Sequence, residues 1–348
     1  MTARVGTCVL PNPVMTASGT AGHGTELAAY FDLSALGAVV VKSLSVTPWA
    51  GNQAPRLVPA AAGMLNSVGL QNPGIDAWLE DDLPALAKTG ARVVVSVWGR
   101  TVRDYAEVGH RLATALSRAT RPLAAPEGAR AATPVVAIEA NISCPNVEDR
   151  ERMFAHSAEA TKAAVGALAG TLASTGLPVW AKLSPNVTDL AAMAGAALAG
   201  GAAGLTLVNT LMGLAIDPAS GRPRLGGGGG GLSGPALHPV AVRAVYECRQ
   251  AFPEAAIVGV GGVGSGYDAA ELISAGADAV QVGTASFVDP RAPLNVLRQL
   301  QAWCAAHGLA SVSELVGRAQ PGEAEVRAFP GGERAGGRAV PERASGSE

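Results

Sequence analysis

Two lysines end short apolar runs in a chain that takes almost all of its positive charge from arginine. Lys42 follows Val39-Val40-Val41 and precedes Ser43, and Lys182 ends Val179-Trp180-Ala181-Lys182. A lysine in such a place can simply extend its stem and reach solvent. Two of them in a lysine-poor sequence favour another interpretation, in which each charge stabilises an anionic ring or a substrate carboxylate.

The densest polar cluster follows another apolar run, as Asn141-Ile142-Ser143-Cys144-Pro145-Asn146. Asparagine amides both donate and accept hydrogen bonds, which suits the edge of a planar ligand. A lone cysteine is usually a small buried apolar residue. The position of Cys144, on a loop beside Asn141 and Lys182, instead favours a nucleophile or base. The other three cysteines are expected to be packing residues: Cys8, Cys248 and Cys304.

Further polar groups and glycines end the remaining apolar runs. Asn209 and Thr210 follow one run, Asn66 stands in a long connecting segment, and two glycine signals come late, at Gly261-Gly262 and Gly283-Thr284. Glycines after the last two strands of an α/β barrel are typical of a phosphate site. No cluster of His, Asp or Glu suggests a metal site. Two histidines near these groups remain undecided: His23 and His156.

Eight short apolar runs must position these groups. Each is nearly continuous in apolar residues, as in parallel strands covered on both faces. The predicted strands are Val14 to Ser18, Ala38 to Ser43, Arg92 to Trp98, Ala137 to Ser143, Val179 to Ser184, Gly204 to Thr210, Ala256 to Gly262 and Ala279 to Ala285.

Longer amphipathic stretches fill the gaps and predict one helix after each strand. They are Thr25 to Leu36, Ile75 to Ala87, Val102 to Leu116, Ser157 to Leu172, Asp189 to Leu198, Ala236 to Arg249, Tyr267 to Ala275 and Pro293 to Ala306. Eight βα units favour a (β/α)8 TIM barrel with its site at the carboxyl ends of the strands. An open doubly wound sheet is less favoured, because the turn after its first strand lacks the dinucleotide spacing.

Two segments interrupt the repeat, and the end of the chain differs in composition. Val46 to Pro73 is too long for an ordinary connection and should fold over the barrel mouth. Leu211 to Pro235 carries six glycines, Gly226 to Gly231, whose backbone is either mobile or closely approached by a ligand. We expect one catalytic domain over 1–317 and a disordered tail over 318–348.

Composition excludes several classes of protein. The chain has 348 residues and a formal net charge of −2, so no global positive field gathers nucleic acid or anionic membrane. The apolar runs are too short to span a bilayer, and the amino terminus lacks the pattern of a signal peptide. The four cysteines show no paired spacing. A cytosolic protein is therefore expected.

Taken together, the motifs resemble dihydroorotate dehydrogenase. The resemblance runs from about Asn12 to Leu300 and is carried by seven ordered motifs. They are Asn12-Pro13-Val14-Met15 through Ser18-Gly19-Thr20, Lys42-Ser43, Gly63 to Gly74, Asn141 to Val147, Leu207 to Thr210, Gly231 to Pro235 and Gly261-Gly262-Val263. The cysteine at 144 is like the soluble class 1 enzymes, since class 2 enzymes carry serine there. Asn141 to Val147 and Asn209 to Asp217 look more like the NAD-linked subgroup.

The resemblance implies an FMN enzyme that oxidises dihydroorotate to orotate in pyrimidine synthesis. Cys144 would remove the C5 proton while hydride passes from C6 to flavin N5, and Lys42 would assist. The implied flavin residues are Ser18, Lys42, Ser43, Asn141, Lys182, Ser233, Gly234, Gly261, Gly262, Gly283 and Thr284. The implied substrate residues are Lys42, Asn66, Val68, Gly69, Leu70, Asn141, Asn146, Asn209 and Thr210.

The sequence predicts partners and is compatible with two alternative functions. A homodimer is expected, with a separate FAD and iron–sulfur electron-transfer subunit as a further partner, and the electron acceptor is not specified. A phosphate-binding lyase or aldolase with Lys182 as a Schiff base is one alternative. A non-catalytic flavin-binding module is another. Ser43 stands where the family usually has threonine, and the loop Glu148 to His156 lacks the family's glycines.

Overall fold

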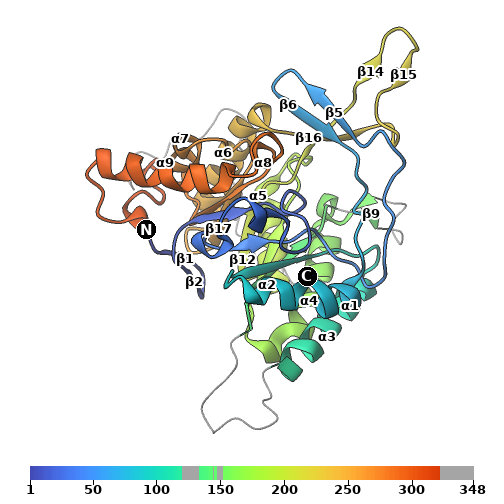
Figure 1. Ribbon diagram of the computed structural model, residues 1–348, viewed down its shortest axis with the longest axis horizontal. Helices are drawn as coiled ribbons and strands as arrows, with labels where there is room; N and C mark the ends of the chain where they lie inside the picture. The colour runs from blue at the N-terminus through green and yellow to red at the C-terminus, as the bar shows by residue number, and fades with distance from the viewer. Residues whose placement is uncertain (120–132, 144, 147–151, 322–348) are drawn as a thin grey trace, which may run out of the picture.

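The computed structural model describes residues 1–119, 133–143, 145–146 and 152–321 of the chain (Figure 1). Cys144 and residues 322–348, both singled out from the sequence, lie outside this part.

Eight parallel strands form the central sheet, and each falls within or close to a predicted one. Their spatial order follows the sequence from β4 through β7, β8, β11, β12, β17 and β18 to β3. The prediction of a (β/α)8 barrel is confirmed. The strands are β3 (Val14–Thr16), β4 (Val39–Val40), β7 (Val93–Val97), β8 (Val135–Asn141), β11 (Val179–Lys182), β12 (Gly204–Leu207), β17 (Ala256–Val260) and β18 (Ala279–Val282).

The barrel closes between the first and second of these strands in the sequence. Met15 and Ala38 form an isolated parallel bridge there. The side chain of Thr16 adds to it, since its Oγ1 accepts a hydrogen bond of 2.8 Å from the Val40 amide and donates to the Val40 carbonyl at 3.3 Å. A buried hydroxyl thus joins two very short strands where few backbone hydrogen bonds are available.

The bottom of the barrel is filled by apolar side chains and covered by the N-terminal hairpin. Its strands are β1 (Ala3–Val5) and β2 (Cys8–Leu10). Val5 and Leu10 are fully buried and belong to the same cluster as Trp180 on β11. Side chains therefore fill the lower barrel, as in other barrels of eight strands, and the upper end is left for a site.

Helices surround the barrel, with α6, α7 and α9 on one side and α2, α3 and α4 on the other (Figure 1). The N-terminal turns of α4, α5 and α7 are capped by Ser157, Asp189 and Ser265. The helices are α1 (Ile75–Ala77), continued by a π-helical turn (Trp78–Asp82) into α2 (Leu83–Lys88), α3 (Val102–Ala119), α4 (Ala158–Leu172), α5 (Leu190–Ala199), α6 (His238–Ala251), α7 (Gly266–Ala275), α8 (Ala285–Val288) and α9 (Ala292–Ala306).

The first predicted helix is wrong. Thr25 to Leu36 forms two short 3-10 turns, Glu26–Ala29 and Leu33–Ala35, separated by three residues of which Tyr30 and Asp32 are exposed. Asp32 caps the second turn by accepting a hydrogen bond from the Ser34 amide. This local alternative interrupts the helix, as short polar side chains often do. Further 3-10 turns lie at Phe154–His156, Ala173–Thr175, Pro235–Leu237 and Val312–Glu314.

The two long insertions pair with each other and form a cap sheet of four antiparallel strands. Its order is β13 (Leu211–Gly213), β16 (Gly230–Ser233), β6 (Gly63–Asn66) and β5 (Leu57–Ala60). A small hairpin, β14 (Ile216–Asp217) and β15 (Arg222–Pro223), projects beyond it in Figure 1. A further short pair is β9 (Pro145–Asn146) and β10 (Arg152–Met153).

Part of the six-glycine run is crowded by the protein's own chain. A β-carbon at Gly226 would lie 2.4 Å from the Gln53 carbonyl oxygen, and one at Gly230 would lie 2.4 Å from the Asn66 carbonyl oxygen, whereas one at Gly228 would meet no atom within 4 Å. Real β-carbons do not approach other atoms as closely as 2.4 Å. Gly226 and Gly230 allow the two insertions to pack backbone against backbone.

Candidate active site

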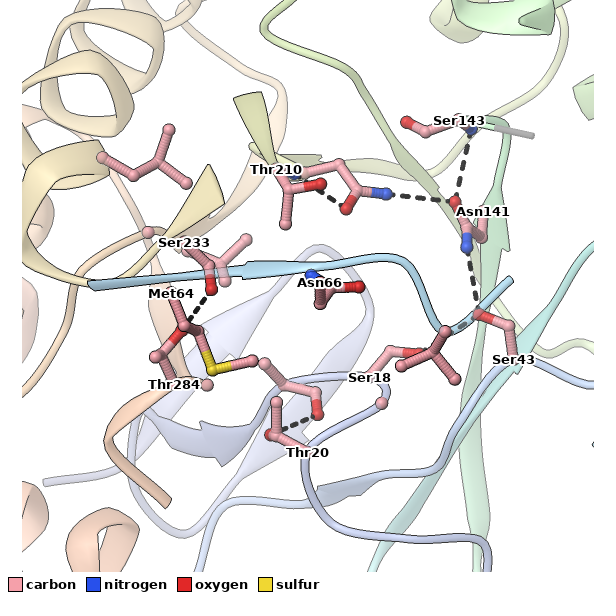
Figure 2. Close-up of a pocket in the computed structure, with 18 of the residues that line it drawn as sticks. Ser18, Thr20, Ser43, Met64, Asn66, Asn141, Ser143, Thr210, Ser233 and Thr284 are labelled. Carbon is pink, nitrogen blue, oxygen red and sulfur yellow. Dashed lines mark hydrogen bonds between the residues drawn. The ribbon is translucent and has the colours of Figure 1, made fainter. Parts of the chain in front are cut away.

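A cavity of about 380 Å³ lies between the carboxyl ends of the barrel strands and the cap sheet. Figure 2 shows hydroxyl and amide groups converging on it from both sides. The cavity brings together these sequence-predicted residues: Ser18, Lys42, Ser43, Asn66, Val68, Gly69, Leu70, Asn141, Lys182, Asn209, Thr210, Ser233, Gly234, Gly261, Gly262, Gly283 and Thr284.

A chain of side-chain hydrogen bonds runs around one side of the mouth. Ser18 Oγ lies 3.2 Å from Ser43 Oγ, and Ser43 Oγ accepts a hydrogen bond of 3.1 Å from Asn141 Nδ2. Asn141 Oδ1 in turn accepts one of 3.2 Å from Asn209 Nδ2, and Asn209 Oδ1 accepts one from the Thr210 amide at 2.9 Å. Residues at the ends of β3, β4, β8 and β12 are thereby fixed relative to one another.

Lys42 is a half-buried cation in the cavity wall. A β-carbon at Gly19 would lie 4.0 Å from Lys42 Nζ, so the ammonium borders the turn after β3. Burial, and then the charge of Arg56, lower the pKa of Lys42 below its ordinary value. In the described part of the chain no carboxylate pairs with this ammonium. The site therefore favours an anionic ligand group beside Lys42.

Lys182 has a different environment, inside the barrel below the mouth. Its ammonium lies 3.6 Å from Glu139 Oε1, and the side chains are 6% and 0% exposed. Glu139 Oε2 accepts a hydrogen bond of 2.8 Å from Gln281 Nε2. This lysine lines the cavity as half of a buried ion pair, so its charge is already compensated.

The cap contributes Asn66 and the loop that follows it. Asn66 Nδ2 donates to the Gly231 carbonyl at 3.3 Å, which links β6 to β16. Asn52 holds the next turn, because its amide donates to the Val68 carbonyl and its side chain donates to Ser67. Leu70 has a φ of 61°, an unfavourable backbone conformation for a leucine. Such strain in a cavity wall is typical of a binding loop.

The far side of the cavity has the geometry of a phosphate cradle. Gly234, Gly261 and Gly262 all have positive φ values, of 98°, 142° and 68°. A β-carbon at Gly262 would lie 2.6 Å from that of His238, the first residue of α6. Thr284 Oγ1 donates to Ser233 Oγ at 2.8 Å. Backbone without side chains, together with two adjacent hydroxyls, suits the oxygens of a phosphate monoester.

Several candidates from the sequence lie elsewhere. Cys144 is outside the described residues, although Ser143 before it lines the cavity. The backbone of Asn146 belongs to β9. Neither undecided histidine lines the cavity: His156 is exposed, and burial lowers the pKa of His23. The remaining cysteines are buried, as expected, and burial raises the pKa of each thiol: Cys8, Cys248 and Cys304.

Sequence reasoning missed some residues that shape the site. Glu139 and Gln281 are fully buried inside the barrel, and the available signal was a polar residue within an otherwise apolar strand. Asn72 was quoted only within a motif, yet it donates to the Leu70 carbonyl at 2.9 Å and accepts from the Gly74 amide at 2.9 Å. Asn186, which donates to the Thr210 carbonyl, gave no sequence signal.

The described residues contain neither a metal-binding cluster nor a membrane-spanning helix. No group of three or more His, Cys, Asp or Glu side chains could hold a metal ion among them. None of the helices in these same ranges is long and apolar enough to cross a membrane.

The comparisons with known proteins all point to the same family. The family model for dihydroorotate dehydrogenase matches residues 2–303. Similar proteins are named dihydroorotate dehydrogenase B (NAD(+)), catalytic subunit. The one from Geobacter sp. (strain M21) is 44% identical over 317 residues, 91% of this chain and 97% of that protein. The one from Desulforudis audaxviator (strain MP104C) is 46% identical over 310 residues, 89% of this chain and 94% of that protein.

Proposed function

Because this chain belongs to the dihydroorotate dehydrogenase family, as a class 1 member, we propose that it is the catalytic subunit that oxidises (S)-dihydroorotate to orotate in pyrimidine synthesis with bound FMN. The cavity carries this proposal, since it joins a phosphate cradle, a ring of amides and a half-buried lysine that has no carboxylate partner among the described residues. The family is flavin-dependent in general, and the mononucleotide is our assignment.

The described residues fit a flavin mononucleotide. The glycine backbone of 234, 261–262 and 283, with Ser233 and Thr284, would hold one phosphate monoester. Ser18, Ser43, Asn141, Lys42 and Lys182 would contact the ring. When bound, FMN would take up the two electrons and the hydrogen that leave C6 of the substrate.

The substrate would lie between the amides and the cap. Asn66, Asn141, Asn209 and Thr210, with Asn146, would hydrogen-bond the flat pyrimidine and hold it against the flavin. Lys42 and the backbone of Val68, Gly69 and Leu70 would bind its carboxylate. Because the cap covers the cavity, the ring would react with limited access to water.

Cys144 would act as the general base. It follows Ser143, whose backbone amide donates to Asn141 Oδ1 at 3.3 Å. The loop that carries Cys144 therefore begins beside the hydrogen-bonded side chains of Asn141 and Asn209. A thiolate is a competent base for the C5 proton. Lys42 would stabilise negative charge that develops on the substrate as this proton leaves.

We also infer a separate partner subunit, because the similar proteins are named as catalytic subunits of an NAD(+) enzyme. That partner would carry FAD and an iron–sulfur cluster and pass electrons to NAD+. A homodimer of this chain would form the catalytic core, and the protein would act in the cytoplasm.

Flavin identification and turnover test the proposal. The purified chain should release FMN on denaturation, and it should form orotate from dihydroorotate with an artificial electron acceptor. Release of FAD, or no flavin after reconstitution, would contradict the cofactor assignment. Bound FMN without turnover would favour a flavin-binding module. A Lys182 adduct trapped by borohydride would favour the lyase or aldolase.

A further inference from the structure

We propose that Glu139 is a positioning residue, whose buried carboxylate holds the Lys182 ammonium in place so that it faces the flavin. The proposal rests on the proposed function, because that function places the flavin above Lys182. It adds a residue that does not line the cavity and that would act on the flavin only through another side chain.

The geometry places Glu139 directly below Lys182. In the pairing of β8 with β11, Glu139 lies opposite Trp180, and Asn141 lies opposite Lys182. The Lys182 ammonium therefore reaches back by two positions along β8 to lie 3.6 Å from Glu139 Oε1. The ion pair crosses the adjacent strands inside the barrel, where neither side chain is open to bulk water.

Gln281 fixes the other carboxylate oxygen from the far side of the barrel. It belongs to β18, is fully buried, and donates to Glu139 Oε2 at 2.8 Å. The carboxylate thus has a hydrogen-bonded amide at Oε2. At Oε1 it has the Lys182 ammonium as an ion-pair partner at 3.6 Å, and Oε1 accepts no hydrogen bond in the described part of the chain. A charge that is buried in this way costs several kcal/mol unless it is paired and hydrogen-bonded, and the pairing also fixes its direction.

Comparison of the two cavity lysines supports a role beyond packing. Lys42 has no carboxylate partner among the described residues, whereas Lys182 has one that is completely buried. Lys42 can therefore move toward an incoming anion. Lys182 is pre-positioned, so it would donate to the flavin at little cost in side-chain entropy. Without Glu139, the Lys182 side chain would lose the ion-pair partner that holds its ammonium in one place.

The alternative is that the Glu139–Lys182 ion pair only stabilises the barrel. In that case its loss would reduce stability and leave the properties of the flavin unchanged. A double-mutant cycle separates the two roles, because a residue that acts only through Lys182 has no effect once Lys182 is replaced.

The test uses the full chain with Glu139→Gln, Lys182→Met and both changes together. The control is Asp278→Asn, which breaks the Arg249–Asp278 pair of 3.1 Å outside the cavity. The Kd for FMN, the midpoint potential of the bound flavin and the thermal midpoint are measured for each protein.

We expect Glu139→Gln and Lys182→Met each to weaken FMN binding about tenfold or more. Lys182→Met should also lower the flavin midpoint potential, because a cation near the ring favours its anionic reduced form. The double variant should bind FMN within about twofold of Lys182→Met alone, and it should recover thermal stability lost in Glu139→Gln, because no unpaired buried charge remains. Asp278→Asn should lower the thermal midpoint and leave the FMN affinity and the potential unchanged.

An unchanged FMN affinity in Glu139→Gln would overturn the positioning role. So would a loss of FMN affinity caused by Glu139→Gln that persists at full size in the Lys182→Met background. A wild-type chain that binds no FMN would instead overturn the proposed function and this role with it, so the two failures are distinct.

Discussion

Asn209 Nδ2 donates a hydrogen bond of 3.2 Å to Asn141 Oδ1, although the two residues lie 68 positions apart in the sequence. Asn141 ends β8 and Asn209 follows β12, so the bond passes over the end of β11. Each amide is oriented by the other before any ligand binds. A planar substrate would therefore meet amide groups whose donors and acceptors already point in fixed directions (Figure 2).

Asn209→Ala should weaken substrate binding much more than flavin binding. The change removes one amide that would contact the pyrimidine and leaves Asn141 Oδ1 with the Ser143 amide as its donor. We expect KM for dihydroorotate to rise roughly tenfold to a hundredfold. Steady-state kinetics and FMN titration measure the two effects, and an equal loss of both would contradict the assignment of Asn209 to the substrate.

Lys42→Ala should reduce the rate at which dihydroorotate reduces the flavin, with little effect on flavin retention. The side chain of Lys42 is half-buried, its ammonium lies beside Gly19, and it has no carboxylate partner among the described residues. Removal of such a group typically lowers the rate by about 10²- to 10³-fold. Anaerobic stopped-flow absorbance gives the rate, and an unchanged rate would remove Lys42 from the mechanism.

The lowered pKa of Lys42 predicts that the difference in stability between Lys42→Met and wild type depends on pH in the flavin-free protein. Burial lowers the pKa of Lys42 in the folded state, so its charged form destabilises the fold. This penalty is fully present below the folded-state pKa and is lost as the pH rises to the unfolded value of about 10.4. Lys42→Met should therefore be more stable than wild type at pH 7, and the advantage should shrink toward pH 10.5. Denaturant unfolding at several pH values would show a constant difference if Lys42 did not titrate in this way.

Cys144→Ser should slow flavin reduction by roughly two to four orders of magnitude, the usual contribution of a positioned base. Orotate binding should remain nearly intact, because the amides that would hold the ring are unchanged. Cys304→Ser is the matched control. Its thiol is buried on α9, so the substitution should leave the rate of flavin reduction almost unchanged. Equal rates in wild type and Cys144→Ser across pH 6 to 10 would mean that another group takes the proton.

Gly262→Ala should weaken FMN binding. Its φ of 68° is strained for alanine, and the new β-carbon would lie 2.6 Å from that of His238. Strain of about 1–3 kcal/mol would be relieved by movement of the cradle, which corresponds to a loss of roughly fivefold to 150-fold in FMN affinity. Gly170→Ala is the control: it lies in α4 with no atom near the new β-carbon, so FMN affinity should not change and stability should rise slightly.

The barrel and most of the site could be predicted because both depend on local patterns. Buried parallel strands appear as continuous apolar runs, and the site residues follow them directly. Contacts between distant segments could not be predicted. The glycine run packs against the first insertion, and the Glu139 carboxylate meets Gln281, 142 residues further along the chain. The failure at Thr25 to Leu36 has a local cause, since capping by Asp32 competes with helix formation.

Anaerobic mixing of the purified FMN-loaded chain with dihydroorotate tests the central claim most directly. We predict that the flavin absorbance bleaches in a single turnover and that one orotate forms for each flavin reduced, with no added partner protein. Flavin that stays oxidised while dihydroorotate is bound, or orotate that forms without flavin reduction, would contradict FMN-dependent oxidation in this cavity.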